Sequence, residues 1–270
     1  MDKNSSAFLA DPLVDSHIHT RLCGHAVGEM EEYVQAALRK KLKKIIFLEH
    51  MEEGIHSLHG KTWLSEEDFD AYFAEGERLR SVYADAIEIG LGVECGYNPD
   101  YRAVLKSRLA RRCWDQVGIS CHFLKIEGMA QHLNMFSRKE ENTQLARHSG
   151  TEDILHRYFT TLIEAVNYLP GTMLCHLDGA LRYLPEISLS EMHHGLIDVL
   201  LQAVKDNNLA IEINTSGIDI RGEQFPDRRI LAKAVDHNIP FIFGSDAHKP
   251  EQVGRHFTAV KRTLSAKFGL

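Results

Sequence analysis

An α/β fold built from parallel β/α units is the class that this sequence predicts. Short apolar runs rich in β-branched residues alternate with longer amphipathic patterns along the 270 residues, and each kind of segment occurs seven times. Parallel strands need such long crossovers, which are right-handed. Ionisable side chains also follow almost every strand pattern, and this is the position at which parallel β/α barrels carry their chemistry.

The seven strand patterns are short apolar runs that end in polar residues. They are Leu13–His17, Lys44–Glu49, Ile87–Glu94, Gln116–His122, Gly171–His176, Leu209–Asn214 and Pro240–Ser245. Closed into a barrel, these strands would bring their C-terminal ends to one mouth. An open, doubly wound sheet has the same order of elements, so the order alone leaves both architectures open.

The helical patterns lie between the strands. They are Glu29–Lys43, Ser65–Ala84, Asp100–Trp114, Glu152–Tyr168, Ser190–Asn207, Asp227–His237 and Glu251–Ala266. Ser65 with Asp68 three residues later, and Thr151 before acidic residues, are N-cap signals. Segment 123–150 shows no regular pattern, and we expect a long loop that covers the substrate. No repeat or linker divides the chain, which predicts one domain.

Composition excludes several classes of protein. Acidic residues outnumber basic ones by 38 to 31, the net charge is −7, and the pI is about 6.1. This charge disfavours long nucleic acids and membrane surfaces as partners, and no apolar run reaches the ~18 residues of a membrane span. The N-terminus shows no secretory signal. Five cysteines without a CxxC pair predict reduced thiols and a cytoplasmic setting.

The chain has 16 histidines, and many of them stand at the ends of predicted strands. His17 and His19 are two residues apart, as are Asp246 and His248, so extended backbone points each pair to one side. Nine side chains of the types that bind metals follow the strands in this way: His17, His19, His25, His50, Glu94, His122, His176, Asp246 and His248. One ion needs three to five protein ligands, so nine predict two or three divalent ions, with Glu94 as a bridge. Mixed imidazole and carboxylate ligands suit Zn, Mn or Fe.

Other histidines and the cysteines are expected to have structural roles. Most of the remaining histidines fall in loops or helices and are predicted to be solvated or to cap helices. His132 and His148 are exceptions, because they could reach a substrate from the long loop. Cys95, Cys121 and Cys175 each neighbour a proposed ligand, and alternation along a strand points them behind the barrel wall.

The motifs DSHIHT, CGHA, LEH, GVE, SCH, CH and GSDAH occur in this order and fill all nine positions. They resemble the motifs of the polymerase and histidinol phosphatase (PHP) superfamily over nearly the whole chain. The stretches EEYVQAALRKKL, GVECGYNPD, HLDGALRY and EINTSGIDIRGEQFP are most similar to the stand-alone L-histidinol-phosphate phosphatases. The stretch LEHMEEG lacks a proline that is often found in this family shortly after the histidine, and small residues follow the stretch HLD. Both departures from the family pattern concern the substrate pocket.

The resemblance implies a distorted (β/α)7 barrel of the TIM type, formed by a single PHP domain over residues 1–270, with a trinuclear metal site at the C-terminal ends of the strands. It assigns the ligands to three ions, two of which share Glu94. The implied sets are His17, His19, Glu94 and Asp246; Glu94, His122 and His176; and His25, His50 and His248.

The activity implied is hydrolysis of L-histidinol phosphate to L-histidinol and phosphate, a step of histidine biosynthesis. A hydroxide that bridges two metal ions would attack phosphorus in line. Arg182 and Arg221 follow strands five and six and are the candidates for binding phosphate. Asp246 or His248 would protonate the leaving alkoxide.

Asp15 and Asp178 are predicted to orient ligand imidazoles. Three alternatives stay open at this level. The chain could be another PHP phosphoesterase that acts on a nucleotide, a short oligonucleotide or a sugar phosphate. It could be an amidohydrolase-like metal enzyme, although that class often uses a lysine ligand that we do not find. It could also be a metal-holding domain that serves assembly. The sequence does not determine the oligomeric state.

Overall fold

The computed structural model describes residues 10–184 and 186–268. Residues 1–9, on which part of the prediction about a secretory signal rests, lie outside the described residues. Seven parallel strands form one sheet in the order β1-β2-β3-β4-β7-β8-β9. These strands are β1 (Val14–Ile18), β2 (Lys44–Met51), β3 (Glu88–Gly96), β4 (Val117–Ser120), β7 (Met173–Leu174), β8 (Ala210–Asn214) and β9 (Phe241–Gly244).

The first and last strands meet, so the sheet closes almost completely into a barrel. Ile18 at the end of β1 pairs in parallel with Ala247, which follows β9. The His19 main-chain N–H donates to the Ala247 carbonyl at 2.9 Å. The predicted barrel is therefore confirmed, and the open sheet is not formed. The barrel is irregular where β7 is only two residues long.

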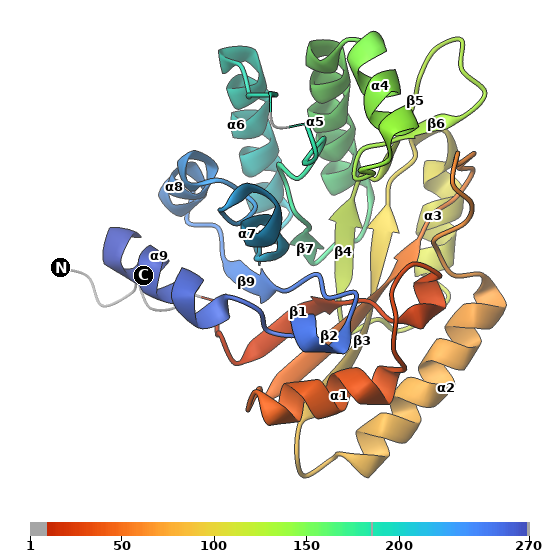
Figure 1. Ribbon diagram of the computed structural model, residues 1–270, viewed down its shortest axis with the longest axis vertical. Helices are drawn as coiled ribbons and strands as arrows, with labels where there is room; N and C mark the ends of the chain where they lie inside the picture. Colours follow the sequence, from red (N-terminus) through yellow and green to blue (C-terminus); the bar gives the residue numbers. More distant parts are fainter. Residues whose placement is uncertain (1–9, 185, 269–270) are drawn as a thin grey trace.

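Helices surround the barrel (Figure 1). They are α1 (Met30–Arg39), α2 (Glu66–Val82), α3 (Arg102–Leu109), α4 (Glu140–His148), α5 (Thr151–Tyr168), α6 (Glu191–Asp206), α7 (Ser216–Arg221), α8 (Arg228–Asp236) and α9 (Phe257–Phe268). Ser65 caps α2 as predicted, and its hydroxyl accepts from the Asp68 N–H at 3.2 Å. Helix α1 ends before the predicted Lys43 because Lys41 adopts a left-handed conformation, with φ of 57°. A 3₁₀ turn, Pro250–Gln252, occupies the predicted start of α9.

Segment 123–150 is partly regular, which corrects the prediction of an irregular loop. Strands β5 (Phe123–Lys125) and β6 (His132–Asn134) form an antiparallel hairpin, and α4 follows. The hairpin and α4 lie together beside α5 (Figure 1). Such short elements bury few side chains of their own, so they leave almost no hydrophobic period in the sequence.

The floor of the barrel is apolar and narrow. Leu48, Met173 and Cys175 are fully buried and form a cluster separate from the main core, which contains the buried faces of the helices. Two glycines make room for this cluster, Gly92 and Gly118, because a Cβ atom on either would approach the Leu48 side chain, at 2.8 and 3.0 Å. A Cβ atom on Gly118 would lie 2.6 Å from the Cys175 sulfur, so a larger residue at 118 would displace the floor.

The position of Cys175 corrects a prediction. We expected this thiol behind the barrel wall, opposite His176, but it lies inside the barrel and groups with His17 and Glu212. Strand β7 ends at Leu174, and His176 has a positive φ of 25°, so alternation stops and both side chains turn inward. Cys95 and Cys121 belong to the main core, as expected. All five cysteines are free thiols. Within residues 10–184 and 186–268, no helix is long and apolar enough to cross a membrane.

Candidate active site

One buried carboxylate lies at the centre of the C-terminal end of the barrel. Glu94, near the end of β3, is fully buried. Its Oε1 atom lies 2.8 Å from His176 Nε2 and 3.0 Å from His122 Nε2. Its Oε2 atom lies 3.1 Å from His50 Nδ1 and 3.3 Å from His17 Nε2. Within 3.3 Å, each oxygen therefore faces a different pair of imidazoles, which is the arrangement of a carboxylate that bridges two ions.

A second group gathers on the Oε2 side of Glu94. His17 Nε2 lies 2.9 Å from His19 Nε2, and His19 Nε2 lies 3.5 Å from both Glu94 Oε2 and Asp246 Oδ1. A tetrahedral ion with bonds of about 2.0–2.2 Å keeps its ligand atoms about 3.3–3.6 Å apart. These four side chains come from β1, β3 and the end of β9, and their spacing is close to that of a ligand shell.

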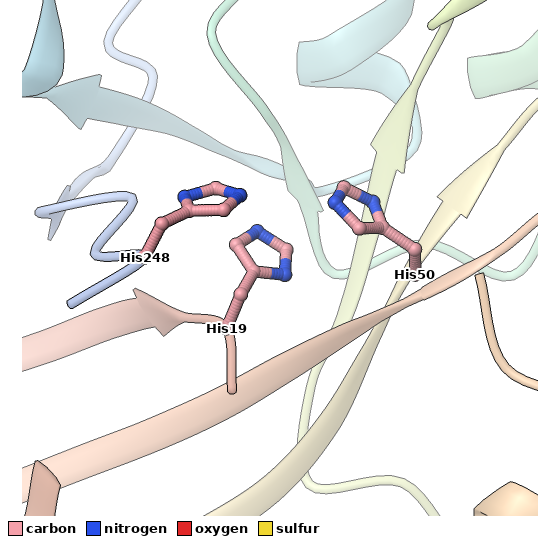
Figure 2. A group of neighbouring side chains, drawn as sticks. All are labelled: His19, His50 and His248. Atoms are coloured by element: carbon pink, nitrogen blue, oxygen red, sulfur yellow. The ribbon is translucent and has the colours of Figure 1, made fainter. Parts of the chain in front are cut away.

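A third group lies at the rim. His25 Nε2 faces His248 Nε2 at 2.8 Å. His50, His19 and His248 form another group whose ligand atoms lie within 4.8 Å of one another. Figure 2 shows these three rings converging on one space, with His50 opposite the other two. His50 therefore lies between the buried groups and the rim. Its ring stacks on that of His25 with centroids 5.2 Å apart, although no possible metal-binding group among the described residues contains both.

The lowered pKa values of the rim histidines favour the binding of a metal cation. His25 Nδ1 donates to the Cys23 carbonyl at 3.3 Å, and His248 Nδ1 donates to the Asp246 carbonyl at 3.1 Å. Loss of hydration and the charge of His50 lower the pKa of His25 to about 3. Loss of hydration also lowers the pKa of His248. Both rings are then neutral with lone pairs on Nε2 that face each other, a repulsive contact that a divalent ion would relieve.

The buried groups also have the chemistry of a metal site. Burial alone would raise the pKa of Glu94, but the surrounding imidazoles hold it well below its ordinary value. Burial likewise opposes ionisation of Asp246, yet the hydrogen bond with His19 and the charges of His17 and His248 keep its pKa well below the usual range. Two ionised carboxylates among converging imidazoles suit Zn, Mn or Fe.

Two further buried glutamates orient ligand imidazoles, and neither was among the predicted site residues. Glu212 on β8 accepts from His17 Nδ1 at 2.7 Å, and Glu52 accepts from His122 Nδ1 at 2.7 Å. Each occupies space that a glycine leaves free. A Cβ atom on Gly244 would lie 1.9 Å from Glu212 Oε1, and one on Gly96 would lie 1.9 Å from Glu52 Oε1. Such carboxylates fix the tautomer of a ligand histidine and raise its basicity.

A third buried glutamate faces His19 but does not bond to it. Glu49 Oε2 lies 4.0 Å from His19 Nδ1, and neither atom has a hydrogen-bond partner among the described residues. The other oxygen, Glu49 Oε1, accepts from the Thr20 N–H at 2.8 Å and from its hydroxyl. Burial raises the pKa of Glu49 to about 8. The two unpartnered atoms are placed to form a carboxylate–imidazole pair after a small movement.

Of the two arginines predicted to bind phosphate, Arg182 lies at the site. Its guanidinium group is 7% exposed and stacks between the rings of Phe136 and Phe225, at 4.5 and 5.0 Å. Arg182 Nη1 lies 3.6 Å from Asp246 Oδ2 and 3.3 Å from the Ser216 hydroxyl. A buried cation whose one carboxylate partner lies at this distance can bind an additional anion.

Arg221 lies elsewhere and holds the main chain. Its Nη2 donates to the Leu181 carbonyl and its Nε donates to the Arg182 carbonyl, at 3.0 and 3.1 Å. It belongs to α7, a six-residue helix that we did not predict. The position of Arg221 indicates that it supports the segment that carries Arg182.

Asp15 and Asp178 hold main-chain N–H groups, which differs from the predicted contact with imidazoles. Asp15 accepts from Ser245 N at 2.9 Å and from Gly254 N at 2.7 Å, while Asp178 accepts from Asp227 N at 2.9 Å. Asp15 thus ties β1 to the segment after β9. That segment is strained at Asp246, where φ is 50°.

Among the described residues, neither His132 nor His148 of segment 123–150 contacts any of the nine proposed ligands. His132 pairs with His56: its ring accepts from the His56 N–H at 3.1 Å, and the two rings stack. His148 is exposed at the end of α4. Phe136 does reach the centre, with its ring 4.6 Å from that of His176 and 5.3 Å from that of His122.

A barrel whose strands bring imidazoles and carboxylates to one mouth defines a class of metal-dependent hydrolases. Comparison with known families agrees with this class. The model of the PHP domain matches residues 15–216, and the model described as PHP-associated matches residues 228–268. The chain therefore belongs to the PHP family.

Curated relatives are similar over almost the full length. The chain is 30% identical over 257 residues to the "Probable histidinol-phosphatase" of Deinococcus radiodurans, covering 92% of each chain. It is 24% identical over 262 residues to the histidinol-phosphatase of Bacillus subtilis, covering 91% of this chain and 97% of the relative. The protein is accordingly a histidinol-phosphatase-like hydrolase of the PHP family.

A solved structure supports the fold. The histidinol phosphate phosphatase of Lactococcus lactis, in complex with Zn, L-histidinol and phosphate, superposes with a TM-score of 0.69. The match covers 95% of this chain and 94% of the Lactococcus chain at 19% sequence identity. The shared fold and the clustered histidines and carboxylates are consistent with metal ions in this chain.

Proposed function

We propose that this protein is a metal-dependent phosphomonoesterase that hydrolyses L-histidinol phosphate to L-histidinol and phosphate. The observation that carries the proposal is Glu94, whose two oxygens face four imidazoles beside the buried guanidinium of Arg182. Phosphate monoesters need large rate enhancements and strong charge stabilisation, which this combination of groups suits. The substrate is inferred from the curated relatives, which are histidinol-phosphatases.

The nine proposed ligands would hold two or three divalent ions. We assign His17, His19, Glu94 and Asp246 to the first ion. The second would share Glu94 and use His122 and His176, and the third would use His25, His50 and His248. Divalent ions at these positions supply a water of lowered pKa and neutralise charge on the phosphate. The role of the chain is to fix these side chains; Glu212 orients His17 and Glu52 orients His122.

Arg182 would bind the phosphate. Its stacking between Phe136 and Phe225 holds the guanidinium plane in one orientation, so little side-chain entropy is lost when an anion binds. Arg221 keeps a supporting role in this proposal, because its donors already bond to carbonyls at 181 and 182.

Asp246 and His248 are the candidates nearest the leaving group. Asp246 is held ionised by its neighbours, so it orients and accepts rather than donates a proton. His248 has a side chain that is 28% exposed, which gives it access to solvent for exchange of a proton. Because Nε2 of His248 would bind the third ion and its Nδ1–H already donates to the Asp246 carbonyl, we assign proton delivery to the leaving alkoxide to a water molecule that His248 and Asp246 orient at the rim.

Segment 123–150 would cover the bound substrate within a single PHP domain. Phe136 already packs against His122 and His176, so the segment reaches the metal-facing side chains and excludes water there. The reaction would belong to histidine biosynthesis. A cytoplasmic location fits five free thiols.

The test is steady-state release of phosphate from L-histidinol phosphate and from a panel of nucleotide and sugar monophosphates. We expect kcat/KM of at least ~10⁴ M⁻¹s⁻¹ for L-histidinol phosphate, within the ordinary range of enzymes, and far lower values across the panel. Equal, low rates on all substrates would reject L-histidinol phosphate. A single preferred nucleotide or sugar phosphate would instead identify another PHP phosphoesterase.

A further inference from the structure

The nine proposed ligands differ in charge between the inside of the barrel and its rim. Inside, the His17 and His19 side chains are fully buried and face the carboxylates of Glu94 and Asp246. At the rim, the His25 ring makes no contact within 4.0 Å with any carboxylate of the described residues. His50 and His248 do contact the inner carboxylates, with His50 Nδ1 3.1 Å from Glu94 Oε2 and His248 Nδ1 3.5 Å from Asp246 Oδ1, and the buried Cys23 thiol groups with His25 and His248. The assigned inner ligand sets therefore include carboxylates, while the assigned rim set consists of imidazoles.

The hydrogen-bond partners of the ligand imidazoles also differ between the inner positions and the rim. The far nitrogens of His17 and His122 bond to the buried carboxylates of Glu212 and Glu52 at 2.7 Å. The far nitrogens of His25 and His248 bond to main-chain carbonyls at 3.3 and 3.1 Å. A carboxylate partner makes an imidazole a stronger ligand than a carbonyl partner does, and loss of such a partner costs about 10–100-fold in metal affinity.

Exposure adds to this difference. His25 is exposed at the rim, although its ring turns toward His248. The side chain of His248 is 28% exposed and that of His50 is 11% exposed, whereas those of His17 and His19 are 0% exposed. Ligands on an exposed segment lose more conformational entropy when they bind an ion. An ion there also keeps sides open to solvent and to an incoming anion.

We propose that the rim position formed by His25, His248 and the shared His50 is a weak metal site that a phosphate group completes, whereas the inner positions bind their ions tightly without it. The inference rests on the ligand assignment under the proposed function. A divalent ion held by neutral imidazoles keeps its full charge, so a phosphate oxygen is the anionic ligand that it lacks. Metal and phosphate then bind to the rim cooperatively, and each strengthens the other by the same factor.

The experiment is a calorimetric titration of chelator-treated, full-length protein with Zn²⁺, without and with inorganic phosphate at constant ionic strength. We expect two tight equivalents and a third at least about tenfold weaker. Phosphate should tighten only the third, within the range of about 5- to 150-fold that is usual for coupled sites. Three equivalents of equal affinity, or a third that ignores phosphate, would overturn the inference.

His25→Ala locates the effect. We expect this variant to lose the third equivalent and its response to phosphate while it keeps the two tight equivalents and its circular dichroism spectrum. His156→Ala, which removes an exposed histidine on α5, should match the wild type. Equal weakening of all three equivalents in His25→Ala would contradict a separate rim site.

These results are distinguishable from failure of the proposed function. If the third equivalent responds to phosphate but another phosphate ester is the preferred substrate, the rim site stands and the proposed substrate fails. If L-histidinol phosphate is hydrolysed well and three equivalents bind alike, the rim inference fails alone. If no metal binds, both fail.

Discussion

The barrel interior has an apolar floor and, two residues further along the same strands, a polar level that carries the proposed ligands. On the floor, Leu48 and Met173 pack in a small apolar cluster against glycines of neighbouring strands. One step further along, β2 presents His50 and β3 presents Glu94 among charged and hydrogen-bonding groups. Because alternate residues of a strand face the same side, two residues separate the two environments.

This difference shows how stability and chemistry are divided along each strand. Leu48 and Met173 on the floor are apolar and fully buried, so they can stabilise the barrel without metal, whereas the Cys175 sulfur borders the polar level above. The upper level gathers buried carboxylates and imidazoles that are costly to desolvate and are compensated only when they pair with one another or with a cation. We therefore expect substitutions on the floor to alter folding and substitutions two residues away to alter metal binding and activity.

The largest expected effect is on activity. Glu94→Gln should lower kcat/KM for the preferred phosphate ester by at least about 10³-fold, equivalent to about 4 kcal/mol, because it removes the charge that four imidazoles share. Bound metal, measured by atomic emission, should fall with it. Glu88→Gln is the matched control, since Glu88 is exposed at the opposite end of the same strand. Wild-type activity in Glu94→Gln would contradict the site.

Substitutions on the floor should lower the free energy of unfolding rather than the activity. Leu48→Ala removes a fully buried side chain and should lower the free energy of unfolding by about 2–5 kcal/mol, measured by urea denaturation. The folded variant should keep its metal content and its kcat within a few-fold. Leu58→Ala, at a residue that is 40% exposed, should cost less than about 0.5 kcal/mol. Loss of metal with unchanged stability in Leu48→Ala would refute the division between the two levels.

A smaller effect, on metal affinity, is expected from the carboxylates that hydrogen-bond to the ligand imidazoles. Glu212→Gln should weaken metal binding about 10–100-fold, because a neutral amide orients His17 less strongly. Gly244→Ala disturbs the same pair of side chains without a change of charge, since its Cβ would lie 1.9 Å from Glu212 Oε1 and 2.8 Å from the Cβ of His17. Both variants should shift metal affinity in the same direction in a competition assay with a chromophoric chelator. An effect in only one of them would argue against this contact as the cause.

The smallest and most specific effect concerns pH. Burial raises the pKa of Glu49 to about 8 from 4.5, so the folded, metal-free protein holds a proton that the unfolded chain releases. Stability from this group is present at low pH and is lost as pH rises from about 5 to 8. The free energy of unfolding of the wild type should therefore fall relative to Glu49→Gln over this range. Parallel pH profiles for the two would contradict this, and Glu67→Gln, at an exposed residue of α2, should follow the wild type.

Much of the fold could be predicted because its strands and main helices are long or regular enough to leave a pattern. Alternation and helical periodicity located all seven barrel strands and the main helices. The hairpin β5–β6, α4 and α7 were missed because short elements bury few side chains and have weak periods. Cys175 was misplaced because alternation cannot predict the positive φ of the following His176.

The proposed ligands were found because strand ends converge, a property of topology that the chain order reveals. Their carboxylate partners were not, because each depends on a contact between distant segments. Glu212 is a single acid in an apolar strand and meets His17, which is 195 residues away in the chain. Its phase with Asn214, at the end of the same strand, was an available signal that it faces inward. Asp15 was assigned to an imidazole because sequence does not distinguish that role from binding a main-chain N–H.

The most direct test of the account is release of phosphate from L-histidinol phosphate by chelator-treated protein, before and after Zn²⁺ or Mn²⁺ is restored. The account predicts almost no activity without metal, recovery when metal is added back, and no recovery in Glu94→Gln. Equal activity with and without metal, or full recovery in Glu94→Gln, would contradict a metal-dependent centre at the C-terminal end of this barrel.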